Sequence, residues 1–97
     1  MVSIVKDNDT LRCVFSGRID TVAATEMDCE INRKVLTSAM PVVFDMKDVA
    51  YVSSAFLRIC ISAAKTLGSE RFRIVHVNPA ILKVFKISGF DKLMVIE

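Results

Sequence analysis

Two adjacent serines, Ser53 and Ser54, are the residues of this sequence whose type and position best suit chemistry. They lie between an apolar run that ends near Tyr51 and an amphipathic run that continues to Leu67, so they open a predicted helix. A serine at this place accepts a hydrogen bond from a free backbone N–H and contributes about 1 kcal/mol. The same place tolerates a phosphate, because free N–H groups and the helix dipole favour negative charge. The residues alone therefore leave a helix cap and a phosphorylation site as alternatives.

The other reactive side chains do not form a catalytic constellation. The single histidine, His76, is expected near the end of a strand, where contact with the backbone is a simpler interpretation than ligand binding. Asp45 and Asp48 flank the expected end of another strand, and a polar turn is a simpler interpretation than a divalent-cation site. We therefore expect no enzyme activity, no bound metal and no cofactor. A small enzyme that uses Cys60 or His76 is a distant alternative.

The three cysteines, Cys13, Cys29 and Cys60, are widely spaced and form no CxxC pair. With one histidine in the chain, this pattern supports neither a zinc site nor a disulfide framework. Free cysteine packs as a small hydrophobic side chain. We therefore expect all three thiols to be buried.

Length and composition indicate one folded domain that spans residues 1–97. Hydrophobic residues make up 53% of the chain and charged residues 25%, which is typical of a globular protein. The net charge of +2 comes from dispersed basic residues, which argues against a nucleic-acid partner. No apolar run approaches the roughly 18 residues that a membrane span needs, and the N-terminus does not resemble a signal peptide. We therefore expect a cytoplasmic protein without membrane insertion.

Hydrophobic periodicity predicts an N-terminal hairpin followed by alternating helices and strands. The hairpin covers residues 3–20 around a turn at 7–9, with Cys13 and Phe15 on its apolar face. The next element is a helix whose N-terminus is capped by Asp20 or Thr21. Its expected apolar face consists of Val22, Met27, Ile31, Val35 and Leu36. The later elements are a strand at 42–46, a helix from Ser53 or Ser54 to Leu67, a strand at 71–77, a helix at 80–88 and a strand at 92–97. This order predicts an α/β fold with a mostly parallel sheet and right-handed crossovers, comprising about five strands and about three to four helices.

The run from Val42 to Lys65, "VVFDMKDVAYVSSAFLRICISAAK", resembles the signature of STAS domains, the fold of anti-sigma factor antagonists. In that family a strand ends in aspartate, a short turn follows, and Asp/Ser-Ser-x-Gly-Leu opens a helix. "FSGRID" at 15–20 resembles the family's Gly-x-hydrophobic-Asp, and "NPAILKVFKISGFDKLMVI" at 78–96 resembles its last helix, glycine and strand. The resemblance covers essentially the whole chain, and it implies a single STAS domain.

The resemblance implies a bacterial anti-sigma factor antagonist. The expected partner is an anti-sigma factor that is also an ATP-dependent serine kinase: it binds the unphosphorylated antagonist and releases the phosphorylated one. The motif places the phosphoacceptor at Ser54, with Ser53 as the fallback. The expected partner-contacting residues are Asp20, Thr21, Tyr51, Val52, Ser53, Phe56 and Arg58.

Phe56 departs from the family motif, which usually has glycine just before the leucine. A bulky side chain there would obstruct a partner or serve as an apolar anchor. This departure motivates a second hypothesis, a non-phosphorylated STAS interaction subunit of a lipid transporter or of another signalling complex. The sequence leaves open whether the domain also forms a weak homodimer.

Overall fold

The N-terminal hairpin is present as predicted in the computed structural model, which describes residues 2–35 and 37–97. Strand β1 (Val2–Asp7) pairs antiparallel with β2 (Thr10–Ile19). The turn between them contains Asn8 at a φ of +57°, a left-handed conformation that asparagine tolerates better than most residues. The hairpin supplies the two strands at one edge of the sheet.

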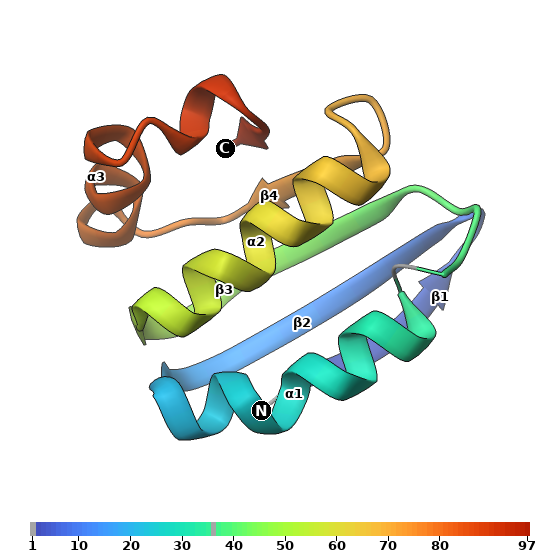
Figure 1. Ribbon diagram of the computed structural model, residues 1–97, viewed down its shortest axis with the longest axis horizontal. Coiled ribbons are helices and arrows are strands. Elements are labelled where there is room, and N and C mark those ends of the chain that lie inside the picture. Colours follow the sequence, from blue (N-terminus) through green and yellow to red (C-terminus); the bar gives the residue numbers. More distant parts are fainter. Residues whose placement is uncertain (1, 36) are drawn as a thin grey trace.

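The remaining strands run parallel to β2, in the order β1-β2-β3-β4-β5, and helices connect them (Figure 1). Neighbouring parallel strands need a crossover connection, and such connections are right-handed in nearly all proteins. The elements after the hairpin are α1 (Thr21–Lys34), β3 (Val42–Val52), α2 (Ser54–Leu67), β4 (Phe72–Val75), α3 (Pro79–Ile87), the short 3₁₀ helix η1 (Phe90–Lys92) and β5 (Val95–Ile96). The predicted α/β fold is confirmed.

The core lies between the helices and one face of the sheet. Phenylalanine rings from neighbouring strands meet edge to face, with centroids 4.9 Å apart for Phe15 and Phe44 and 4.8 Å apart for Phe44 and Phe72. The helices add Met27, Ile31, Phe56, Cys60 and Phe85 to the same cluster. Figure 1 shows α1 and α2 side by side across this face, with α2 over β3. In the described part of the chain, no helix covers the opposite face.

Strand β3 is longer than predicted, because it continues from Val42 to Val52 instead of ending near Met46. Asp48 therefore lies within a strand that pairs with Ser16 of β2, and the prediction of a turn there was wrong. The ladder between β2 and β3 contains register irregularities near Ser16 and Gly17, which break the regular alternation of side chains. Without that alternation, the second half of the strand gives no clear strand signal in the sequence.

Helix α1 differs from the prediction in the residues that face the core. Val22, expected on the apolar face, is 66% exposed, whereas Ala24 is buried with Met27. Cys29 is exposed, so the prediction that all three thiols are buried was wrong for this one. Leu36, also expected on that face, lies outside the described residues. Nine residues are about two and a half helical turns, so Val22 lies on the opposite side of α1 from the buried Ile31 and faces solvent.

Candidate functional site

The starts of α1 and α2 lie next to each other because β2 and β3 are parallel and end together. Ile19 is the register partner of Val52 at the carboxyl ends of these strands. The backbone N–H of Ser53 donates a 2.8 Å hydrogen bond to the carbonyl of Ile19, which extends the pairing by one step. Asp20 and Ser53, the residues that precede the two helices, are thereby brought to the same edge of the sheet. The predicted contact residues at Asp20 and Ser53, which come from two distant segments, therefore lie at the same edge of the sheet.

Ser53 and Ser54 occupy different positions at the start of α2. Ser53 is the N-cap: it is 6% exposed, and its hydroxyl accepts a 3.3 Å hydrogen bond from the N–H of Phe56. Its carbonyl accepts the first helical hydrogen bond, from Leu57, at 3.1 Å. Ser54 is the first helical residue, and it is exposed. The cap and the accessible hydroxyl are thus assigned to two different residues.

At the start of α1, Asp20 and Thr21 are a helix cap and a first helical residue, as Ser53 and Ser54 are in α2. A carboxylate oxygen of Asp20 accepts a 2.8 Å hydrogen bond from the N–H of Ala23, so Asp20 is the N-cap. Thr21 is the first residue of the helix, and both residues are exposed. This pair forms the part of the site that faces α2 across the ends of the strands.

Tyr51 and Val52 end β3 beside the serines. Tyr51 is 41% exposed, and the guanidinium carbon of Arg18 lies 4.4 Å from the centroid of its ring. Val52 is partly buried and packs against the core. Arg18 was not among the predicted contact residues, because its contact with the ring depends on the register in which Arg18 pairs with Tyr51. That register follows from a shift in the β2–β3 ladder between Gly17 and Arg18, where β3 has one extra residue between Val49 and Tyr51, and no sequence pattern indicates it.

Phe56 belongs to the core and not to the surface of the site. Its relative exposure is 0%, and its ring meets Phe15 edge to face with centroids 5.1 Å apart. The prediction that Phe56 contacts a partner was therefore wrong. The physical reason is helix geometry, because residue 56 lies on the side of the first turn that faces the sheet. The bulk of this side chain neither obstructs nor anchors a partner, so it no longer favours the interaction-subunit alternative.

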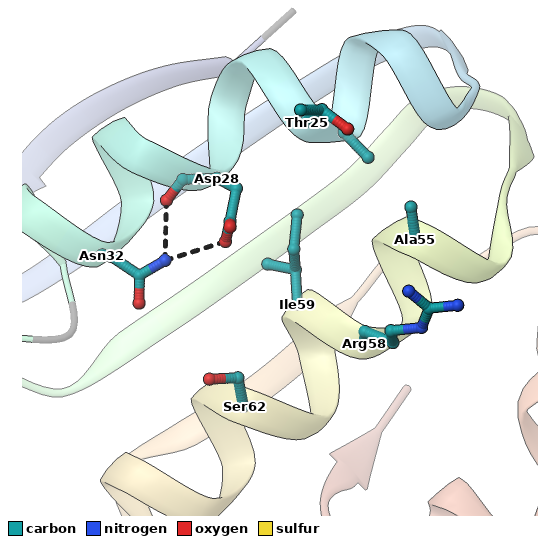
Figure 2. A pocket seen from close by; sticks show the side chains of 8 residues that line it. Thr25, Asp28, Asn32, Ala55, Arg58, Ile59 and Ser62 are labelled. Atoms are coloured by element: carbon teal, nitrogen blue, oxygen red, sulfur yellow. Dashed lines mark hydrogen bonds between the residues drawn. The ribbon is translucent and has the colours of Figure 1, made fainter.

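Arg58 is exposed and lines a groove of ≈ 340 Å³ between α1 and α2. Figure 2 shows the groove, with Thr25, Asp28 and Asn32 on the α1 side and Arg58 and Ser62 on the α2 side. The amide of Asn32 donates 2.8 Å hydrogen bonds to the backbone carbonyl and the carboxylate of Asp28. Arg58 was a predicted contact residue, but the groove was not predicted, because it exists only once the two helices lie side by side.

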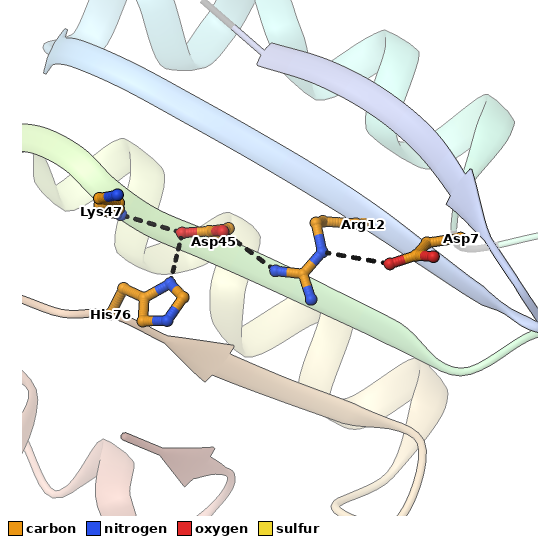
Figure 3. A network of polar contacts seen from close by, with 5 residues as sticks. All are labelled: Asp7, Arg12, Asp45, Lys47 and His76. Carbon is orange, nitrogen blue, oxygen red and sulfur yellow. Dashed lines mark hydrogen bonds and ion pairs between the residues drawn. The ribbon is translucent and has the colours of Figure 1, made fainter.

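His76 and Asp45 form a separate polar network on the sheet face away from the helices (Figure 3). The Nδ1 atom of His76 lies 2.9 Å from one carboxylate oxygen of Asp45, and Arg12 donates a 3.0 Å hydrogen bond to the other. Burial alone would raise the pKa of the Asp45 carboxyl. The hydrogen bonds it accepts and the charge of His76 outweigh burial and lower this pKa.

This network changes two interpretations of the sequence. The expected backbone partner of His76 is replaced by a carboxylate, and Asp45 bonds to Arg12 and His76 instead of flanking a turn with Asp48. Among residues 2–35 and 37–97, no group of three or more potential metal-binding side chains comes together. The network is thus a set of contacts between strands, and the candidate site remains at the start of α2.

Comparison with known proteins identifies the family. The family model described as "STAS domain" matches residues 2–97. BtrV of Bordetella bronchiseptica, whose name marks it as a proposed anti-sigma factor antagonist, is 30% identical over 87 residues, covering 88% of this chain and 75% of BtrV. The chain belongs to the STAS domain family, as the sequence resemblance predicted.

Solved structures agree with this assignment. An anti-sigma factor antagonist from Mycobacterium paratuberculosis superimposes with a TM-score of 0.87 and 26% identity, over 99% of this chain and 83% of that one. The Bacillus cell fate determinant SpoIIAA in its phosphorylated form superimposes with a TM-score of 0.76 and 16% identity, over 100% and 91% of the two chains. The likeness to SpoIIAA, at 16% identity, concerns the fold alone.

Across the described residues, none of the helices has both the length and the apolar character for a membrane crossing.

Proposed function

We propose that this protein is an anti-sigma factor antagonist: a regulatory binding protein without enzymatic activity of its own. Two related proteins that carry this description support the proposal, one by sequence and one by structure. The observation that carries the switch mechanism is the exposure of Ser54 beside a buried Ser53. Because the Ser53 hydroxyl caps the helix, the exposed Ser54 hydroxyl is available to a kinase.

Ser54 is the proposed phosphoacceptor, and the proposed partner is an anti-sigma factor with serine kinase activity. In the transfer, the Ser54 oxygen forms a bond to the γ-phosphorus of ATP while the bond to ADP breaks, and the hydroxyl proton passes to a base of the kinase. Phosphorylation adds about −1.5 to −2 charges at pH 7. At the first turn of α2 this charge is compatible with the fold, since the helix dipole favours it.

The partner surface consists of the exposed side chains around Ser54. Asp20 and Thr21 contribute from α1, Tyr51 from β3 and Arg58 from α2. A phosphate in the middle of this surface would oppose an acidic or apolar partner by repulsion and by the cost of desolvation. We therefore expect a modest, reversible interface that phosphorylation weakens without unfolding the domain.

The experiment that tests the proposal is phosphorylation by the cognate anti-sigma kinase, read by intact mass. Incubation with the kinase and ATP should add the mass of one phosphate to the chain, and Ser54→Ala should abolish the gain. Ser53→Ala is the matched control and should still be modified. Full phosphorylation of the Ser54→Ala variant would contradict the assignment.

A capture experiment from the native cell separates this function from the transporter-subunit alternative. The unphosphorylated chain should recover an anti-sigma kinase. Recovery of a transporter ATPase in its place would overturn the proposal. Size-exclusion chromatography over a range of concentrations would show in the same preparation whether the chain also forms a weak homodimer.

A further inference from the structure

Arg58 is an exposed cation whose charge no partner balances among the residues that the structure describes. Other arginines have clear contacts: Arg12 pairs with Asp45, and Arg18 lies over a tyrosine ring. Neither an ion pair nor a side-chain hydrogen bond joins Arg58 to any described residue. The guanidinium is therefore free to take an anionic partner without breaking an existing contact.

The position of Arg58 on α2 directs this free cation toward Ser54. The two residues are four positions apart, which places them on the same side of the helix, one turn from each other. Long side chains on a helix lean back toward its N-terminus. Figure 2 shows the guanidinium of Arg58 extending in that direction, from its own turn toward the turn that carries Ala55. Ser54 immediately precedes Ala55 in the chain, so the guanidinium extends toward the first turn of α2.

The acid on the other side of the groove does not compete strongly for this cation. Asp28 also lines the groove, but its carboxylate already accepts a 2.8 Å hydrogen bond from Asn32. A phosphate on Ser54 would offer Arg58 a higher charge and three acceptor oxygens, which the planar guanidinium can bind in pairs. The one-turn spacing brings the phosphate to the cation without a change in the backbone.

We propose that Arg58 is the intramolecular counter-ion of the phosphate on Ser54. This proposal rests on the proposed function, because it concerns the phosphorylated state of the same site. Arg58 is a positioning residue: it holds the phosphate against the first turn of α2. Phosphorylation then changes the partner surface twice, since it adds negative charge and removes the free cation of Arg58 from contact with the partner.

The test uses the full chain with phosphoserine installed at position 54 during translation by an expanded genetic code. The ³¹P chemical shift is followed against pH to give the midpoint of the second phosphate ionisation. A nearby cation stabilises the dianion, so Arg58→Gln should raise this midpoint by about 0.3 pH unit, the size expected for an exposed pair one helical turn apart. Arg33→Gln, an exposed arginine at the end of α1, is the matched control and should leave the midpoint unchanged. Arg58→Lys should keep part of the effect.

Equal midpoints in the original chain and the Arg58→Gln variant would overturn the proposal, and so would an equal rise in the Arg33→Gln control. Both positions are exposed, so the variants retain the fold. The phosphate is installed without a kinase, which separates this result from the proposed function. A kinase that fails to modify Ser54 would contradict the function and leave the titration interpretable, while a null titration would leave the kinase experiment standing.

Discussion

Ser53 and Ser54 have the same side chain, yet their environments give them different physical roles. The Ser53 hydroxyl is buried and satisfies a backbone N–H of the first helical turn, whereas the Ser54 hydroxyl faces solvent. Substitution of the cap removes a hydrogen bond on which the helix start depends. Substitution of Ser54 removes an exposed hydroxyl that makes its hydrogen bonds with water, so the fold loses little. Stability measurements should therefore separate the two serines before any kinase is available.

Ser53→Ala should lower the free energy of unfolding by about 1 kcal/mol, the usual cost of a lost N-cap. Ser54→Ala should stay within about 0.5 kcal/mol of the original chain, as expected of an exposed position. Urea denaturation followed by circular dichroism measures both. A larger loss in Ser54→Ala than in Ser53→Ala would contradict the assignment of the cap.

Phe56→Ala should lower the free energy of unfolding by about 3–5 kcal/mol, because the substitution leaves a cavity beside Phe15. Phe56→Leu keeps most of the volume and should cost much less, which makes it the matched control. The same urea experiment measures both variants. If Phe56→Ala cost under about 1 kcal/mol, the ring would not lie in the core.

Because Phe56 is buried, binding of the Phe56→Leu variant to the proposed anti-sigma partner should match that of the original chain.

At the scale of secondary-structure elements, Asp45 joins segments that are distant in the sequence. It lies on β3, accepts a hydrogen bond from Arg12 of β2, and meets His76 directly after β4. His76 has a φ of +60°, which is rare for a residue other than glycine, so the contact fixes an unusual backbone turn before α3. Asn78 then caps α3 and also donates a 3.0 Å hydrogen bond to the carbonyl of Val49 on β3. The side-chain contacts of His76 and Asn78 thus hold the start of α3 to β3.

Asp45→Asn should lower the free energy of unfolding by about 1 kcal/mol at pH 7, a value near the upper end for a partly exposed pair. The pKa of Asp45 is lower in the folded chain than in the unfolded chain. Its stabilisation is therefore complete above about pH 4, the unfolded value, and is lost as the pH falls through the folded value. Urea denaturation at several pH values should show the two chains converge in acid.

Asp48→Asn is the control for this pH series, because Asp48 is an exposed carboxylate on the same strand. It should change the unfolding free energy little at any pH. A difference between Asp45→Asn and the original chain that persists unchanged in strong acid would show that the carboxylate charge is not responsible.

At the scale of the whole molecule, local signals in the sequence predicted the order of the strands and long helices and the bounds of α2, whereas α1 ends at Lys34, before the Val35 of its predicted apolar face. Asn78 followed by proline marked the start of α3, and Gly68, at a φ of +80°, marked the end of α2. The full length of β3 was not predictable, because a register irregularity interrupts its pattern. The burial of Phe56 depends on the side of α2 that meets the sheet, and the groove beside Arg58 depends on two helices lying together. These features depend on tertiary contacts that a single sequence does not encode locally.

The reactivity of the three cysteine thiols reports whether the packed domain excludes a reagent from its core. Burial, with a smaller contribution from the charge of Glu30, raises the pKa of Cys13 to about 12, and burial also raises the pKa of Cys60. Since only the thiolate reacts readily, a thiol reagent at neutral pH should rapidly modify the exposed Cys29 alone in the folded chain and all three cysteines in denaturant. Cys29→Ser should therefore eliminate the fast phase of the native reaction. A fast phase that survives this substitution would mean that the sheet and helices do not exclude the reagent from the core.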